Sequence, residues 1–298
     1  MNFLRQITME QQYEKMNIQW YPGHMTKARR MMEDSLSLVD AVCEILDARI
    51  PRSSRNPELD DLANGKPRLI LLNRADLADP VFTAAWKQHF EDQGLSVLET
   101  DAKSGKGISS ISPCLKRLLK DKVRTYQEKG QAGRKLRVMI AGIPNVGKST
   151  IINRLAGRNA AAAEDRPGVT RGKQWIVVDD SLELLDTPGI LWPKFEDQET
   201  GELLAITNAI KSDIVDRETL AANFMLRLAT YYPEALEARY KIKLSDEMNG
   251  FDLLEEAARK RGFRLSKNEY DLERMANTLL SEYHSGKLGR LTLEQPDE

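Results

Sequence analysis

Residues 136–150 read LRVMIAGIPNVGKST and decide the fold of the chain. The first seven form an apolar run typical of a buried strand, and the residues from Thr150 onward follow a helical pattern. Between them, Gly142 to Ser149 match the spacing G-x-x-x-x-G-K-S, in which glycines let main-chain N–H groups wrap phosphates at a helix N-terminus. A strand before the motif and a helix after it argue against a chance glycine-rich turn.

This loop predicts a binding site for a nucleoside triphosphate. Lys148 is expected to reach the outer phosphate oxygens, and Ser149 to bind Mg²⁺. The residues of the loop and of the first helical turn that we expect to hold the nucleotide are Asn145, Val146, Gly147, Lys148, Ser149 and Thr150.

Short apolar runs recur along the first two thirds of the chain, separated by helix-like segments. They predict strands at residues 41–47, 68–73, 95–100, 136–142, 175–179 and 182–186. Only Asp180 and Ser181 separate the last two, which favours an antiparallel hairpin. The other strands should be parallel and joined by right-handed crossovers. The predicted fold class is therefore α/β, with a doubly wound, mostly parallel sheet.

The sequence pattern changes near residue 200. From Glu202 onward the sequence has helical periodicity and no strand-like run. Residues 272–283 carry one apolar stripe, for which Ser266 and Glu269 would form a capping box. We predict an N-terminal extension at residues 1–17, a sheet domain at 18–195 and a small all-α domain at 200–298.

Composition describes a soluble globular protein, with 41% apolar and 30% charged residues among 298. Two cysteines give no disulfide framework, and no run approaches the ~20 apolar residues of a membrane span. We expect a cytoplasmic protein.

The net charge of −1 hides an uneven distribution of charge along the chain, since the segment from Lys106 to Arg137 has ten Lys or Arg and only two acids. A solvated face is the simpler interpretation, but such a segment also suggests a polyanionic partner.

Asp186-Thr187-Pro188-Gly189 follows the last predicted strand and supplies a second motif. Asp186 would hold Mg²⁺ through water, and the Gly189 N–H would meet the γ-phosphate. Between the two motifs, we expect Thr170 to complete the Mg²⁺ shell only when a γ-phosphate is present. An ordinary surface threonine is the alternative at that position.

Asn73-Arg74-Ala75-Asp76 also follows a predicted strand and reads as a guanine-recognition loop of the Asn-Lys-x-Asp type. Asp76 would accept hydrogen bonds from guanine N1 and N2, Asn73 would brace the loop, and the stem of Arg74 would lie along the base. Such a site discriminates by ~10⁴ or more, because adenine leaves the carboxylate unpaired.

After the next predicted strand, Ala102 and Lys103 resemble the Ser-Ala-Lys loop whose backbone meets guanine O6, with Asp101 in place of the serine.

In this chain the guanine loop precedes the phosphate loop, the reverse of the Ras-type order. The rotated set of motifs resembles the circularly permuted GTPases. Residues Trp20–Met25, Asp47–Pro51 and Trp192–Lys194 narrow the resemblance to bacterial factors for late assembly of the large ribosomal subunit. It covers nearly the whole chain from about residue 18.

The resemblance implies a GTPase that binds GTP or GDP with Mg²⁺ and is stimulated by the ribosomal subunit. It implies a helical domain that contacts ribosomal RNA, a precursor of the large subunit as partner, no membrane, and a monomer. Ile190 stands where Ras-type proteins have the Gln that positions water, so intrinsic hydrolysis should be slow. The resemblance implies that His24 is a catalytic group, in addition to Lys148 and Thr170. The alternative is that His24 is a structural histidine. The resemblance also implies that Asn145 helps to bind a K⁺ ion. The alternative is that Asn145 only braces the loop.

Two other functions stay open at this stage. A metabolic P-loop kinase would need a second substrate pocket with its own acid or base, for which the sequence offers no constellation. A signalling switch acting on a protein partner would fit the motifs, but the sequence has no lipidation motif and the basic segment favours a polyanion.

The rotated order also has a mechanical consequence. The chain leaves Gly189 through residues 190–193 directly into the helical segment, so a γ-phosphate-driven movement would reach the second domain covalently.

Overall fold

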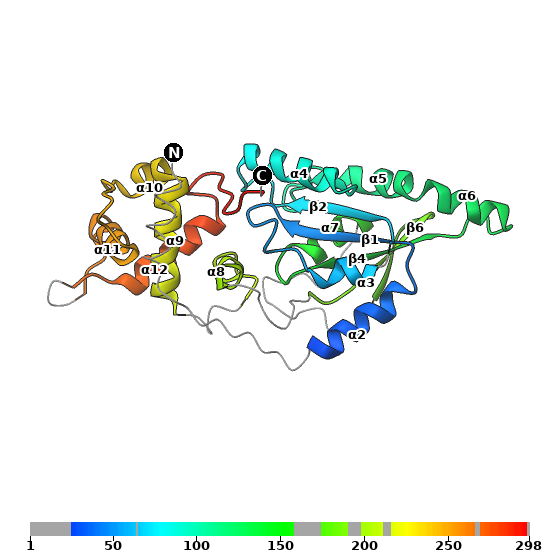
Figure 1. The fold of residues 1–298 in the computed structure, drawn as a ribbon, viewed down its shortest axis with the longest axis horizontal. Helices are drawn as coiled ribbons and strands as arrows, with labels where there is room; N and C mark the ends of the chain where they lie inside the picture. Colours follow the sequence, from blue (N-terminus) through cyan, green and yellow to red (C-terminus); the bar gives the residue numbers. More distant parts are fainter. Residues whose placement is uncertain are drawn as a thin grey trace. The chain divides into compact units, whose positions relative to one another are not determined.

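A computed structural model of the chain describes residues 25–63, 65–157, 174–189, 198–210, 216–265 and 269–296. The chain divides into two compact units (Figure 1). Of the described residues, 25–189 and 294–296 form the sheet unit, and 198–293 form the helical unit. The predicted extension at residues 1–17 lies outside the described residues.

The sheet unit is built on one sheet of six strands in the order β3-β2-β1-β4-β6-β5. β5 is antiparallel to β6, and every other pair of neighbours is parallel. The strand bounds are β1 (Ala41–Asp47), β2 (Arg68–Asn73), β3 (Ser96–Glu99), β4 (Leu136–Gly142), β5 (Gln174–Asp179) and β6 (Leu182–Asp186). The predicted strands, their hairpin and the mostly parallel sheet are confirmed.

One helix precedes β1, and the other helices of the sheet unit connect its strands along the chain. Their bounds are α2 (Met25–Leu36), α3 (Glu58–Ala63), α4 (Pro80–Asp92), α5 (Ile111–Leu118), α6 (Lys120–Glu128) and α7 (Lys148–Ala156), with a 3₁₀ turn η1 (Ile108–Ser110). Val42 of β1 packs with residues of α2 and α3, and Leu46 of β1 packs with residues of α4. Because side chains alternate along a strand, Val42 and Leu46 share one face of the sheet, which these three helices cover.

The connections position the site. From β1 the chain moves through β2 to β3, whereas from β4 it moves the other way toward β6. Right-handed crossovers in opposite directions put helices on opposite faces of the sheet. β1 and β4 are neighbours from which the chain departs in opposite senses, and ligands bind at the carboxyl ends of strands at such a point. Asp47 ends β1 and the phosphate loop starts at the end of β4, so both lie at this point of the sheet.

The helical unit consists of α8 (Gln198–Ile206), α9 (Arg217–Tyr231), α10 (Pro233–Tyr240), α11 (Gly250–Arg261) and α12 (Leu272–His284). The predicted stripe on α12 is buried at Met275, Ala276, Leu279, Leu280 and Tyr283. Among the residues that the structure describes, no helix has the length and apolar character needed to cross a membrane.

The start of α12 differs from the prediction. Its N-cap is Asp271, whose side chain accepts a 2.9 Å hydrogen bond from the Arg274 N–H. The helix therefore starts after Asp271 and not at the predicted capping box of Ser266 and Glu269, of which Ser266 lies outside the described residues. The Glu269 carbonyl accepts a 2.8 Å hydrogen bond from the Leu265 N–H.

The end of the chain returns to the sheet unit. The Glu294 carboxylate accepts hydrogen bonds from the main-chain N–H of Arg52 at 2.8 Å and of Ser53 at 3.0 Å. The Trp86 indole donates to the Glu294 carbonyl at 3.0 Å. The sequence placed residues 200–298 in the helical domain, whereas the described chain leaves the helical unit after Leu293.

Candidate nucleotide site

The phosphate loop runs from Gly142 at the end of β4 to Lys148 at the start of α7. Asn145 and Gly147 have left-handed backbones, with φ of 58° and 103°. A Cβ on Gly147 would lie 2.5 Å from the Asn73 amide nitrogen, so only glycine permits this close approach. Ser149 and Thr150 occupy the first turn of α7, where free N–H groups favour an anion.

Lys148 is buried beneath this loop. Its Nζ donates hydrogen bonds to the carbonyl oxygens of Gly142 at 3.1 Å and Ile143 at 2.8 Å. Burial lowers the pKa of Lys148 to about 8, an effect that the Asp186 carboxylate partly opposes. An ammonium group held against a loop of N–H donors can take the charge of a polyphosphate.

Asp186 ends β6 beside the same loop. Burial raises the pKa of Asp186 to about 6, against the opposing influence of the Lys148 ammonium. Its buried Oδ1 has no hydrogen-bond partner among the described residues. Those residues also contain no group of three His, Cys, Asp or Glu that could hold a metal alone. The orphaned carboxylate oxygen, with Ser149, therefore fits a cation that shares phosphate oxygens and water as ligands.

The turn after Asp186 lies against the phosphate loop. The Thr187 hydroxyl donates a 2.7 Å hydrogen bond to the Ile140 carbonyl, which fixes the turn to β4. A Cβ on Gly189 would lie 2.7 Å from the Lys148 Nζ and 2.9 Å from the Pro144 Cα. Only glycine therefore fits at position 189, the residue whose N–H is predicted to meet the γ-phosphate.

Asn73 joins three separate segments. Its Nδ2 donates a 2.7 Å hydrogen bond to the Val146 carbonyl of the phosphate loop. Its Oδ1 accepts hydrogen bonds from the Ala102 N–H at 3.0 Å and the Thr100 hydroxyl at 3.2 Å. Asn73 is 1% exposed, so these bonds form without competition from water. The predicted bracing role of Asn73 thus has a defined geometry.

Arg74 and Asp76 differ in their surroundings. The Arg74 guanidinium donates a 2.6 Å hydrogen bond to the Asn145 carbonyl and lies 3.8 Å from an Asp47 carboxylate oxygen. Asp76 is exposed, and among the described residues its carboxylate has no hydrogen-bond partner. Its carboxylate is therefore accessible to a base placed along Arg74.

The loop of Ala102 and Lys103 is braced from two sides. Asp101 Oδ1 accepts hydrogen bonds from the N–H groups of Lys103 at 2.8 Å and Ser104 at 3.2 Å. Burial alone would raise the pKa of Asp101, but these bonds and one from the Ser104 hydroxyl hold it below its usual value. Asp101 therefore orders the turn in place of the expected serine.

Sequence reasoning missed the roles of three further residues. Arg154 of α7 donates a 2.5 Å hydrogen bond from Nε to the Ala102 carbonyl and a second one to the Lys103 carbonyl. Asp47 forms a bidentate pair with the fully buried Arg49, with bonds of 2.9 and 2.7 Å, and this orders the loop after β1. Asp47 and Arg49 stood in a motif without an assigned role, and nothing in the local pattern marked Arg154.

Two predicted residues, His24 and Thr170, lie outside the described residues, as does Ile190. The structure brings the other predicted residues together at the carboxyl ends of β2, β3, β4 and β6, at the last residue of a strand, on the loop that follows it or in the first turn of α7. They are Asn73, Arg74, Asp76, Ala102, Lys103, Asn145, Val146, Gly147, Lys148, Ser149, Thr150, Asp186 and Gly189.

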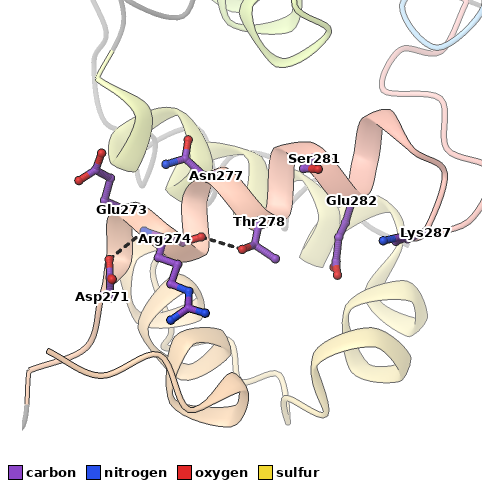
Figure 2. Close-up of a pocket in the computed structure, with 8 residues that line it drawn as sticks. All are labelled: Asp271, Glu273, Arg274, Asn277, Thr278, Ser281, Glu282 and Lys287. Carbon is purple, nitrogen blue, oxygen red and sulfur yellow. Dashed lines mark hydrogen bonds between the residues drawn. The ribbon is translucent and has the colours of Figure 1, made fainter.

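A groove of about 590 Å³ in the helical unit is a weaker candidate. Figure 2 shows that most of its lining lies along α12, where Arg274 stands between the acids Glu273 and Glu282, and that Lys287 follows the helix. Three of its eight lining residues are acids, and the Asp271 carboxylate already accepts from the Arg274 N–H at the start of α12, so this surface suits phosphates poorly.

Comparisons with known proteins show what the whole chain is similar to. Residues 137–239 match the family described as 50S ribosome-binding GTPase. The chain is 46% identical to ribosome biogenesis GTPase A of Bacillus licheniformis, over 95% of this chain and 100% of that protein. It is 31% identical to the Thermotoga maritima protein of the same name, over 94% and 95%.

Solved structures give the same likeness. A GDP-bound YlqF structure is 28% identical and matches with a TM-score of 0.66, over 90% of this chain and 99% of that one. A GNP-bound YlqF structure from T. maritima is 29% identical and matches with a TM-score of 0.62, over 91% and 99%.

Proposed function

The chain belongs to the ribosome biogenesis GTPase A family and is a GTPase of ribosome biogenesis; from this premise we propose that it acts in assembly of the large subunit. The proposal is that GTP hydrolysis is slow in the free protein and is stimulated by binding to a precursor of that subunit. The matching family is described as binding the 50S ribosome, which supports the choice of subunit.

The observation that carries the proposed site is the Asn73 side chain, which joins the guanine loop to the phosphate loop. A single pocket that senses both the base and the phosphates is what a GTP-specific enzyme requires. Asp76 would select guanine, and the backbone of Ala102 and Lys103 would meet the O6 edge.

The phosphate end would work through charge and position. Lys148 would bind the outer phosphate oxygens, while Ser149 and Asp186, with Thr170, would hold Mg²⁺. When bound, Mg²⁺ would neutralise charge on the phosphates. Gly189 would donate its N–H to the γ-phosphate and so report its presence. The K⁺ ion beside Asn145 stays part of the proposal, and hydrolysis rates in KCl and NaCl would test it.

His24 is our proposed group for positioning the attacking water, because Ile190 has no polar atom to do so. Without such a group, hydrolysis in the free protein is slow, and subunit binding would bring His24 into place. This assignment makes stimulation a property of the bound state.

We also propose that residues 192–201 transmit the nucleotide state from Gly189 to the helical unit. A flexible insert in this linker should leave GTP hydrolysis intact and remove the dependence of subunit binding on nucleotide. Nucleotide dependence that survives the insert would contradict the linker role.

The decisive experiment measures GTP hydrolysis by the purified chain alone, with large subunits and with small subunits. We expect large subunits to raise the rate by at least about tenfold, since a group supplied by complex formation is worth far more in other GTPases. Lys148→Ala should abolish both basal and stimulated hydrolysis. Equal rates with either subunit would contradict the proposed partner.

A further inference from the structure

Two successive peptide groups in the turn after β3 are held from opposite sides. The Arg154 guanidinium donates a 2.5 Å hydrogen bond to the Ala102 carbonyl and a second one to the Lys103 carbonyl. Asp101 Oδ1 accepts hydrogen bonds from the N–H groups of Lys103 at 2.8 Å and Ser104 at 3.2 Å. Because the C=O and N–H of a trans peptide point in opposite directions, the cation and the carboxylate bind the same two peptide groups on their two sides.

The two charges support each other through these peptides. A cation on a carbonyl polarises the peptide, so the N–H of that peptide becomes a better donor to the carboxylate. Hydrogen bonds with an ionised partner are also stronger than neutral ones. Burial alone would raise the pKa of Asp101, but its hydrogen bonds and the nearby Arg154 cation lower it. Asp101 therefore keeps the negative charge that this arrangement needs.

Arg154 also lies against the end of the turn. A Cβ on Gly105 would stand 2.7 Å from the Arg154 Nη1. Gly105 has a left-handed backbone, with φ of 94°, and its N–H donates a 2.8 Å hydrogen bond to the Asp101 carbonyl. Glycine at this position thus closes the turn and leaves room for the guanidinium.

The turn meets the proposed base site through Ala102. Two of its N–H groups are taken up by the Asp101 side chain, whereas that of Ala102 donates a 3.0 Å hydrogen bond to Asn73 Oδ1. Asn73 is the first residue of the predicted guanine loop, so the Ala102 N–H lies on the side of the turn where the base is proposed to bind. Its direction depends on the next peptide, which Arg154 and Asp101 hold.

We propose that Arg154 and Asp101 act as a pair that determines how strongly the site selects the 6-oxo group of guanine. The inference rests on the proposed guanine site and deepens it by naming two positioning residues that act through the Ala102 N–H. A recognition group selects its ligand only when supporting hydrogen bonds keep it in its productive place. Arg154 supplies this support from α7, the helix whose first turn carries the proposed phosphate ligands Ser149 and Thr150.

The test measures the equilibrium affinity of the full chain for GTP and for 6-thio-GTP. The analogue keeps the N1–H and the 2-amino group of guanine but carries sulfur, a larger and weaker acceptor, in place of O6. Arg154→Met removes the donors and keeps the aliphatic stem. We expect this variant to weaken GTP binding by about tenfold and 6-thio-GTP binding by less than about threefold, because only the 6-oxo group depends on the held turn. Arg154→Lys keeps the charge without the planar fork and should restore part of the preference for GTP.

The matched control is Lys106→Met. It removes an exposed cation from the same turn, so both affinities should stay at the wild-type values. Equal weakening of GTP and 6-thio-GTP by Arg154→Met would overturn the inference, since a general loosening of the site acts on both nucleotides alike. Unchanged affinities in that variant would overturn it as well.

A double-mutant cycle tests the pair. Asp101→Ser places at this position the residue that the sequence comparison of loops leads one to expect, and it should also weaken GTP binding. Because both side chains hold the same peptides, the double variant with Arg154→Met should bind GTP more tightly than the product of the two single effects requires. Single effects that multiply in full would overturn the pairing.

The experiment separates this inference from the proposed function. Wild type that binds GTP no better than ATP would overturn the proposed guanine site and the inference with it. Wild type that prefers GTP, together with an Arg154→Met variant of unchanged selectivity, would overturn only the role of Arg154.

Discussion

The side-chain amide of Asn73 donates a 2.7 Å hydrogen bond to the main-chain carbonyl of Val146, 73 positions later in the chain. This bond ties the loop proposed to read the base to the loop proposed to hold the phosphates. The two loops follow β2 and β4, which lie on either side of β1 and run parallel to it, so both loops are at the same edge of the sheet and can touch.

Asn73→Ala should weaken GDP and GTP binding by at least about tenfold, because each buried polar group left unpaired costs ~1–3 kcal/mol. The groups concerned are the Val146 carbonyl and the Ala102 N–H. Equilibrium nucleotide titration measures the effect. Thr100→Val removes only one of the Asn73 bonds and should have a smaller effect. Equal affinities for all three proteins would refute the joining role.

Asp76→Asn should shift base preference from guanine toward xanthine, since the amide can donate where the carboxylate could only accept. Competition of GTP and XTP for the nucleotide site measures the change. Asp79→Asn is a suitable control, because Asp79 caps α4 by accepting from the Val81 N–H at 2.8 Å and Asn is an equally good cap. Unaltered GTP preference in Asp76→Asn would remove this loop from the base site.

His24→Ala should slow subunit-stimulated hydrolysis by roughly 10²-fold or more, the lower end of what a positioned proton-transfer group contributes, with little change in GTP affinity. The rate and the affinity are measured separately under single-turnover conditions. His89→Ala on α4 serves as the comparison and should behave as wild type. If affinity falls in parallel with the rate, His24 has a structural role.

Glu294→Gln should change how stability depends on pH. Burial raises the pKa of Glu294 from 4.5 to about 6, against hydrogen bonds from Ser53 that lower it. The folded protein therefore keeps this proton in a range where the unfolded chain releases it, and stability falls as pH rises from about 4.5 to about 6. Glutamine lacks this proton.

The difference in unfolding free energy, wild type minus Glu294→Gln, should thus decrease between pH 4.5 and 6 and stay constant from pH 7 to 8. Urea unfolding at each pH measures it. A difference that rises with pH in the lower range would contradict the buried position of this carboxylate.

Much of the fold followed from local pattern. Residues 136–142 and 182–186 are strands at the predicted bounds, because continuous apolar runs of this length bury both faces in a parallel sheet. The start of α12 was less predictable. Ser266 with Glu269 matched a capping pattern, but Asp271 captures the first free N–H groups of the helix, since a cap depends on the actual path of the chain.

The sequence by itself determined the family and the strands and proposed the residues of the phosphate and guanine loops, since these depend on short patterns that a few neighbouring residues specify. Only the tertiary structure decided that Arg154 holds the carbonyls of Ala102 and Lys103, that Asp47 pairs with a buried Arg49, and that Glu294 returns to the sheet unit. For Arg154 and Glu294 the partners lie far apart in the chain, and Arg49 owes its role to burial. Their energies come from proximity and exclusion of water, which exist only after folding.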